Sequence, residues 1–78
     1  MSTLEDLTDA LARDVIAAMD ELGDDTLIDQ ISKILISTSS TTQEAFMTNI
    51  KVRLSERRAR KFLEEKLARA AKPQGKAE

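Results

Sequence analysis

Residues 41–71, TTQEAFMTNIKVRLSERRARKFLEEKLARAA, decide the fold of this chain. The segment contains neither Gly nor Pro, its apolar residues recur at helical intervals, and Pro73 follows it closely. Thr41 and Glu44 form a capping box, the pairing of a hydroxyl with a carboxylate three residues later that is typical of helix starts. The segment therefore predicts one helix over residues 42–71, about 45 Å long at about 1.5 Å per residue.

The apolar residues of this helix fall on two different faces. With about 100° of rotation per residue, a first stripe in the first half comprises Phe46, Met47, Ile50 and Leu54. A second stripe continues to the C-terminal end and comprises Ala45, Val52, Ala59, Leu63, Leu67 and Ala70. Phe62 lies between the two stripes. Beyond Leu54, basic residues take over the direction of the first stripe, so only the first half of the helix presents that face to a core.

A shorter helix is predicted at the N-terminus, over residues 3–22. Ser2 and Glu5 form another capping box there, and Gly23 is expected to end the helix in the left-handed conformation that glycine adopts readily. Its apolar stripe comprises Leu4, Leu7, Leu11, Val15, Ala18 and Leu22, flanked by Ile16 and Met19.

A second short helix is predicted over residues 25–37, with Asp24 or Asp25 as its N-cap. Its apolar stripe comprises Leu27, Ile28, Ile31, Ile34 and Leu35. Its isoleucines lower the helix propensity, so residues 33–38 also fit a strand, but a single strand would have no partner in this chain. The hydroxyl-rich residues 37–42 are expected to connect this helix to the long one.

These elements predict an all-α fold, a helical hairpin plus a long third helix, in a single domain over residues 1–72 with a disordered tail at 73–78. The second half of the long helix is expected to project beyond the shorter hairpin. A chain of 78 residues has a marginal core, and a projecting helix with apolar residues needs cover. We therefore expect a three-helix, dimeric bundle. A bend near Ser55, which would fold Phe62 back into the monomer, is the alternative.

Composition excludes several kinds of chemistry. The sequence has no Cys, His, Trp or Tyr, so catalysis or metal binding by thiolate or imidazole groups is ruled out. It has no Gly-rich phosphate loop, and the acids between Asp20 and Asp29 lack the spacing of a calcium loop. We therefore expect a protein that is not an enzyme and holds no cofactor and no metal. The lack of a targeting or membrane-spanning segment predicts a cytoplasmic location and no membrane partner.

The net charge of −2 hides a division along the chain. Residues 1–50 carry ten acids and two bases, whereas residues 51–72 carry nine bases and three acids. The densest basic cluster lies in the long helix and is our candidate for a charged contact with a partner; it comprises Arg53, Arg57, Arg58, Arg60 and Lys61. An acidic protein surface, the phosphates of a nucleic acid and the acidic first helix of a second copy are all suitable contacts.

Two other interpretations compete with these contacts. In the first, the charged residues form solvated helix faces held by ion pairs four residues apart, namely Asp9 with Arg13, Glu56 with Arg60 and Glu65 with Arg69. In the second, the long helix is the recognition helix of a helix-turn-helix motif, although the turn lacks the usual Gly. The polar residues that would then face DNA are Thr41, Thr42, Gln43, Thr48 and Asn49.

The function predicted from the sequence is that of a small, non-catalytic interaction or regulatory protein. It is expected to form a homo-oligomer, with a dimer favoured, through its long C-terminal helix and to bind a larger protein partner. The residues assigned to self-association are Val52, Ala59, Phe62, Leu63, Leu67 and Ala70. The alternative is a small nucleic-acid-binding protein that uses the basic segment 51–61.

Overall fold

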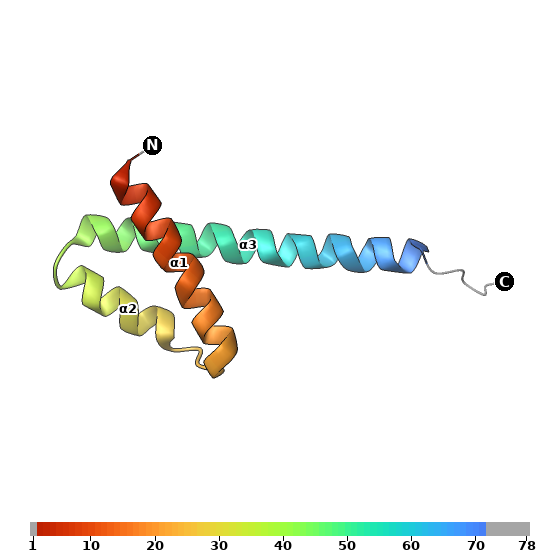
Figure 1. The fold of residues 1–78 in the computed structure, drawn as a ribbon, viewed down its shortest axis with the longest axis horizontal. Coiled ribbons are helices and arrows are strands. Elements are labelled where there is room, and N and C mark those ends of the chain that lie inside the picture. The colour runs from red at the N-terminus through yellow and green to blue at the C-terminus, as the bar shows by residue number, and fades with distance from the viewer. Residues whose placement is uncertain (1, 72–78) are drawn as a thin grey trace.

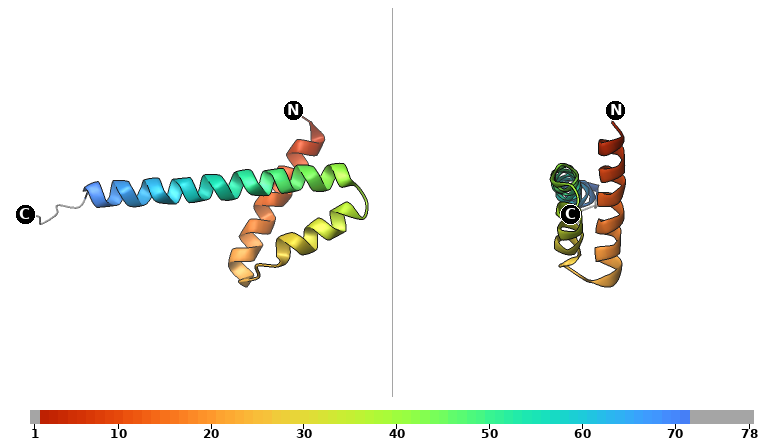
Figure 2. Two further views of the ribbon diagram at one scale, coloured as in Figure 1. Left: turned by 180° about the vertical axis from the view of Figure 1, so that it is seen from behind. Right: turned by 90° about the vertical axis from the view of Figure 1, so that its left-hand side faces the viewer.

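The computed structural model describes residues 2–71 and places them in three helices, α1 (Thr3–Leu22), α2 (Leu27–Ile36) and α3 (Ser40–Ala71) (Figure 1). Helices α2 and α3 form one layer, and α1 crosses the face of α3 in a second layer (Figure 2). The predicted all-α fold of a helical hairpin plus a long third helix is confirmed. The tail predicted for residues 73–78 lies outside the described residues.

Local sequence signals define both ends of α1. The backbone N–H of Glu5 donates to Ser2 Oγ at 3.1 Å, which caps the N-terminus as predicted. Gly23 ends the helix at φ 65°, and its N–H donates to the Met19 carbonyl at 2.8 Å. This left-handed conformation favours glycine, so the predicted C-terminal stop is also confirmed.

Helix α2 is shorter than predicted, because side chains compete for the backbone at both of its ends. The carboxylate of Asp24 accepts hydrogen bonds from the N–H and the hydroxyl of Thr26, at 2.9 and 2.7 Å, so these residues form a turn before the helix begins. Neither Asp24 nor Asp25 is the N-cap; that position belongs to Thr26. At the other end, the Ser37 hydroxyl donates to the Ile34 carbonyl at 2.7 Å.

Helix α3 is one continuous rod from Ser40 to Ala71, with no interruption at Ser55. It begins two residues before the predicted start, because its first turn is capped by Ser39 and not by Thr41. Ser39 Oγ accepts from the Thr42 N–H at 3.1 Å and from the Thr42 hydroxyl at 2.8 Å. The alternative of a bent helix that folds back on the hairpin is therefore wrong.

The core lies where α1 crosses α3. Four apolar side chains are buried there, Ala12 and Val15 from α1 and Phe46 and Ile50 from α3. Partly buried residues from all three helices surround them, namely Leu11, Ile16, Met19, Leu27, Ile28, Ile31, Leu35, Met47 and Leu54. The first stripe predicted for the long helix is thus confirmed as its core-facing side.

The apolar stripe predicted for α1 is wrong at two of its positions. Leu7 and Leu22 are 65% and 67% exposed, whereas Thr8 and Ala12 are buried. The reason is the crossing geometry: α1 passes over α3 instead of running along it, so only the middle of α1 is covered (Figure 1). Small side chains at the crossing let the two helices approach closely. Ile34 is also exposed, because α2 packs chiefly on α3 and touches α1 little.

A buried polar contact fixes the position of α1 on α3. The side chain of Thr8 is almost completely buried, and its hydroxyl donates to the Leu4 carbonyl at 2.7 Å. The same hydroxyl accepts from Asn49 Nδ2 at 2.9 Å, so the buried group is satisfied in both directions. Sliding α1 along α3 would break this contact, which therefore specifies the register of the crossing.

We expect Thr8→Val to destabilise the fold. The change keeps the shape of the side chain but leaves the Asn49 amide without its partner at a partly buried site, at a cost of about 1 kcal/mol. For a domain of this size, such a loss lowers the Tm by roughly 4–8 °C, which circular dichroism measures directly. The control Thr48→Val makes the same change at an exposed position of α3. Equal losses in the two variants would contradict a role for the Thr8 hydroxyl.

Candidate interaction surface on the projecting half of α3

The second half of α3 extends far beyond the other two helices (Figure 1). Among the described residues, the last contacts of α3 with the hairpin are the packing of Leu54 on the core and the ion pair of Arg57 with Asp20. We call residues 58–71 the projecting segment; it is about 21 Å long at about 1.5 Å per residue, and all of its residues are exposed. The radius of gyration is accordingly 17.4 Å, against about 11–12 Å for a compact domain of this length.

Large apolar side chains of α3 face solvent from Val52 onward. Val52 is 61% exposed, and Phe62, Leu63 and Leu67 are 63%, 52% and 59% exposed. The other two residues assigned to self-association, Ala59 and Ala70, are exposed as well. Because α3 is continuous, the helical rotation places Val52, Leu63 and their small neighbours on one side, and Phe62 about 100° away from Leu63.

Part of the basic cluster is engaged inside the chain. Arg53 forms a bidentate pair with Asp9, in which Nε and one terminal nitrogen each donate to a carboxylate oxygen at 2.8 Å. The hydrogen bond from Arg53 lowers the pKa of the Asp9 carboxyl from its usual 3.8. One helical turn further along α3, Arg57 donates a single hydrogen bond to Asp20 Oδ2 through one terminal nitrogen. These two pairs join the acidic helix α1 to the basic helix α3.

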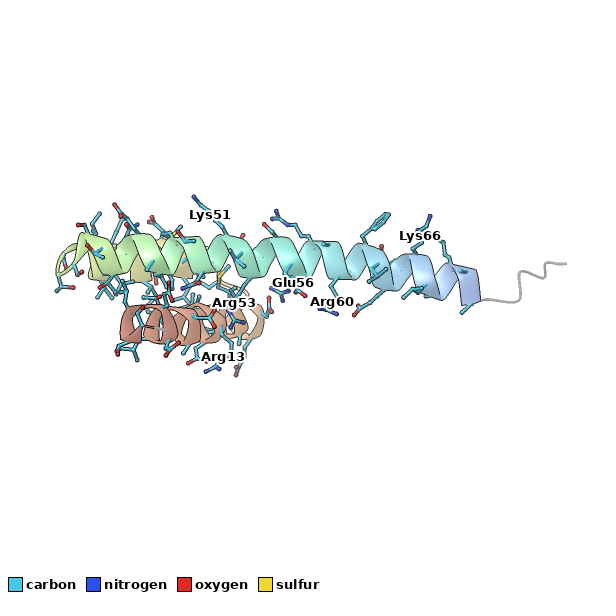
Figure 3. All side chains as sticks on the ribbon, turned by 90° about the horizontal axis from the view of Figure 1, so that it is seen from above. Arg13, Lys51, Arg53, Glu56, Arg60 and Lys66 are labelled. Atoms are coloured by element: carbon cyan, nitrogen blue, oxygen red, sulfur yellow. The ribbon has the colours of Figure 1, made fainter. Side chains whose placement is uncertain are left out.

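Within the described part of the chain, the other three cations of the basic cluster form no ion pair with α1. Arg60 donates to Glu56 Oε2 through Nε at 2.8 Å, which is the pair four residues apart that the sequence predicts. Between residues 2 and 71, no hydrogen bond or ion pair is formed by Arg58 or Lys61. Figure 3 shows Arg53, Glu56 and Arg60 on the side of α3 that faces α1, and Lys51 and Lys66 on the opposite side. The structure therefore divides the predicted cluster into paired and available cations.

The pairing of Asp9 differs from the sequence prediction. Asp9 pairs with Arg53 across the helix crossing, whereas Arg13 pairs with its neighbour Asp14 at 3.2 Å. The spacing of four residues in α1 favours Asp9 with Arg13, but the guanidinium of Arg53 offers two aligned donors to the same carboxylate. Arg53 reaches Asp9 only because the two helices cross, so the spacing within α1 could not predict this pair.

An open groove lies where α1 and α3 diverge. Its volume is about 510 Å³. Apolar side chains of Ile16, Ala17 and Val52 line it, and charged residues flank them, namely Asp9, Arg13, Asp20, Arg53, Glu56 and Arg57. The groove could not be predicted from the sequence, because its existence depends on the angle between the two helices. Its lining thus combines apolar and charged side chains.

Within the described residues, no group of His, Cys, Asp or Glu side chains is arranged to hold a metal ion. Nor does any helix between residues 2 and 71 combine the length and the hydropathy that crossing a membrane requires.

We expect Asp9→Asn to reduce the acid sensitivity of the fold. Because the pKa of Asp9 is lowered in the folded state, its pairing stabilises the protein fully above about pH 4 and is lost as the pH falls through that lowered pKa. The variant should be less stable than the wild type at pH 7, and this difference should shrink toward pH 2. Urea unfolding across this pH range measures both effects.

The matched control is Asp25→Asn, an exposed turn residue that forms none of these ion pairs. It should keep the stability of the wild type at pH 7 and its loss of stability in acid. An Asp9→Asn variant with an unchanged pH profile would show that the pair with Arg53 contributes nothing to folding.

Comparison with known proteins adds no assignment to this surface: no family model, no curated protein and no solved structure matches the chain.

Proposed function

We propose that this chain is a small, non-catalytic interaction or regulatory protein that self-associates through α3 and binds a larger protein partner. One observation carries the proposal. The projecting segment presents Phe62, Leu63 and Leu67 to solvent on the part of α3 that lies beyond the hairpin. Large exposed apolar side chains that lie close together on one short segment are typical of surfaces that bind other proteins.

The energetics of an unsupported helix favour a partner for this segment. An isolated helix of fewer than about 12–15 residues is marginal in water, and helices in proteins draw most of their stability from packing. The projecting segment has that length, and every one of its residues is exposed in the part of the chain that the structure describes. A second helix laid against it would bury its leucines and stabilise its last turns.

The small core of the monomer supports self-association. Among the described residues, only Ala12, Val15, Phe46 and Ile50 are buried apolar side chains. Small domains with so little buried surface are commonly stabilised by oligomerisation, which couples their folding to concentration. A second copy is therefore the first occupant that we assign to the exposed stripe.

The available cations support a separate contact with the larger partner. Arg58 and Lys61 lie about 140° and 160° around the helix from Leu63, so they face away from the stripe. An acidic protein surface would bind the Arg58 guanidinium through paired carboxylate contacts. Self-association and partner binding would then use opposite sides of the same helix.

Sedimentation tests the self-association. We expect the wild type to form dimers as its concentration rises, and Leu63→Glu and Leu67→Glu each to shift it toward monomer, because a carboxylate in an apolar contact is costly to bury. Ala68→Glu adds the same charge to the projecting segment on a side away from Leu63, and should leave the dimer intact. A wild type that remains monomeric at high concentration would refute the proposed self-association.

The nucleic-acid alternative has weaker support. Two of the five cations in the basic cluster, Arg53 and Arg57, already neutralise Asp9 and Asp20. The acidic helix α1 lies beside them, and its charge would repel a phosphate backbone that approached from this side.

Titration with random duplex DNA tests that alternative. We expect fluorescence-labelled DNA to show no binding at physiological salt and only a weak response at low salt. Micromolar affinity with a steep salt dependence would instead indicate that phosphates are the target. Arg58→Glu with Lys61→Glu would serve as the control, since it should abolish any binding that these cations provide.

A further inference from the structure

The exposed side of α3 carries a heptad pattern that continues from the groove to the end of the helix. Its positions alternate in steps of four and three residues, and all are exposed in the monomer. They are Val52, Glu56, Ala59, Leu63, Lys66 and Ala70. We call them the seam. The six positions span about 80° of rotation around α3, with Glu56 at the edge toward α1 and Lys66 at the edge away from it (Figure 3). Such spacing keeps these side chains facing a partner helix along a two-stranded coiled coil.

We infer, on the basis of the proposed self-association, that the seam packs against the seam of a second copy in antiparallel orientation, with the two-fold axis beside Lys61. In this register Val52 faces Ala70 of the second copy, and Ala59 faces Leu63. Glu56 faces Lys66. The two-fold axis repeats each pair once, so the six seam positions are self-complementary.

Charge and size both favour the antiparallel orientation. A parallel, in-register dimer would place Glu56 against Glu56 and Lys66 against Lys66, and like charges in a seam oppose pairing. It would also place Ala59 against Ala59, which leaves a void, and Leu63 against Leu63, which crowds the next layer of the seam. In the antiparallel register a large residue faces a small one and opposite charges meet, as tight packing requires.

The same register accounts for the other exposed apolar residues of the projecting segment. Leu67 lies beside the seam on the side of Arg53 and Arg60, which is the side that faces α1 (Figure 3). Its antiparallel counterpart is Arg53, at the edge of the groove, so Leu67 of one copy would enter the groove of the other and contact Ile16. Phe62 lies on the opposite edge of the seam, where it meets its own equivalent across the axis.

The architecture of the monomer accommodates this dimer. Residues 52–70 overlap over about 28 Å at about 1.5 Å per residue. Antiparallel pairing places the two hairpins at opposite ends of this overlap, whereas a parallel dimer would bring both hairpins to the same end. The groove and the projecting segment thus serve as reciprocal halves of one isologous interface.

Cysteine cross-linking tests the register, and the chain offers a clean background because it has no Cys. Val52→Cys and Ala70→Cys are prepared as separate full-length variants, one with an added tag, then mixed and oxidised. Both are conservative changes at exposed positions, so folding should be preserved. We expect at least tenfold more of the mixed disulfide, Val52→Cys to Ala70→Cys, than of either like-with-like product.

The control variants are Arg58→Cys and Lys61→Cys, which face away from the seam and should cross-link at least tenfold less. Like-with-like disulfides from Val52→Cys, in a protein that sediments as a dimer, would overturn the antiparallel seam but leave the proposed function in place. A dimer in which neither pairing cross-links would likewise overturn the seam. A protein that is monomeric by sedimentation would overturn both.

Discussion

The crossing of α1 over α3 is the constraint on which the rest of this structure depends. Thr8 and Ala12 are small enough to let the helices meet, and the Thr8 hydroxyl, held by Asn49, fixes where they do so. Because α1 crosses α3 instead of following it, the hairpin covers only the first half of the longer helix. The groove, the projecting segment and the exposed leucines are all consequences of that one geometry.

The division of charge along the chain places opposite charges next to each other at the same crossing. Acids of α1 meet bases of α3 in the pairs of Asp9 with Arg53 and Asp20 with Arg57, so the two halves of the chain attract each other within one molecule. Such pairs are individually modest at a partly exposed surface. They nevertheless occupy cations that would otherwise serve a partner, and they leave the available basic side chains farther along α3.

The monomer combines a small apolar core with a long exposed helix. Among the described residues, the monomer buries only four apolar side chains, while a second apolar stripe lies exposed along α3. In the dimer that we propose, the projecting segment of each chain would cover the apolar surface of the other. The side of the helix opposite this stripe would stay free for a different protein.

Local features of this protein were determined by the sequence alone: the three helices, the Ser2 cap, the Gly23 stop and the core-facing stripe around Phe46. Each depends on neighbours within one or two helical turns, so periodicity and capping chemistry suffice to predict it. The buried side of α1, the partner of Asp9 and the groove were decided only by the tertiary structure. These features depend on the angle and register at which two distant helices cross, and helical spacing contains no information about that angle.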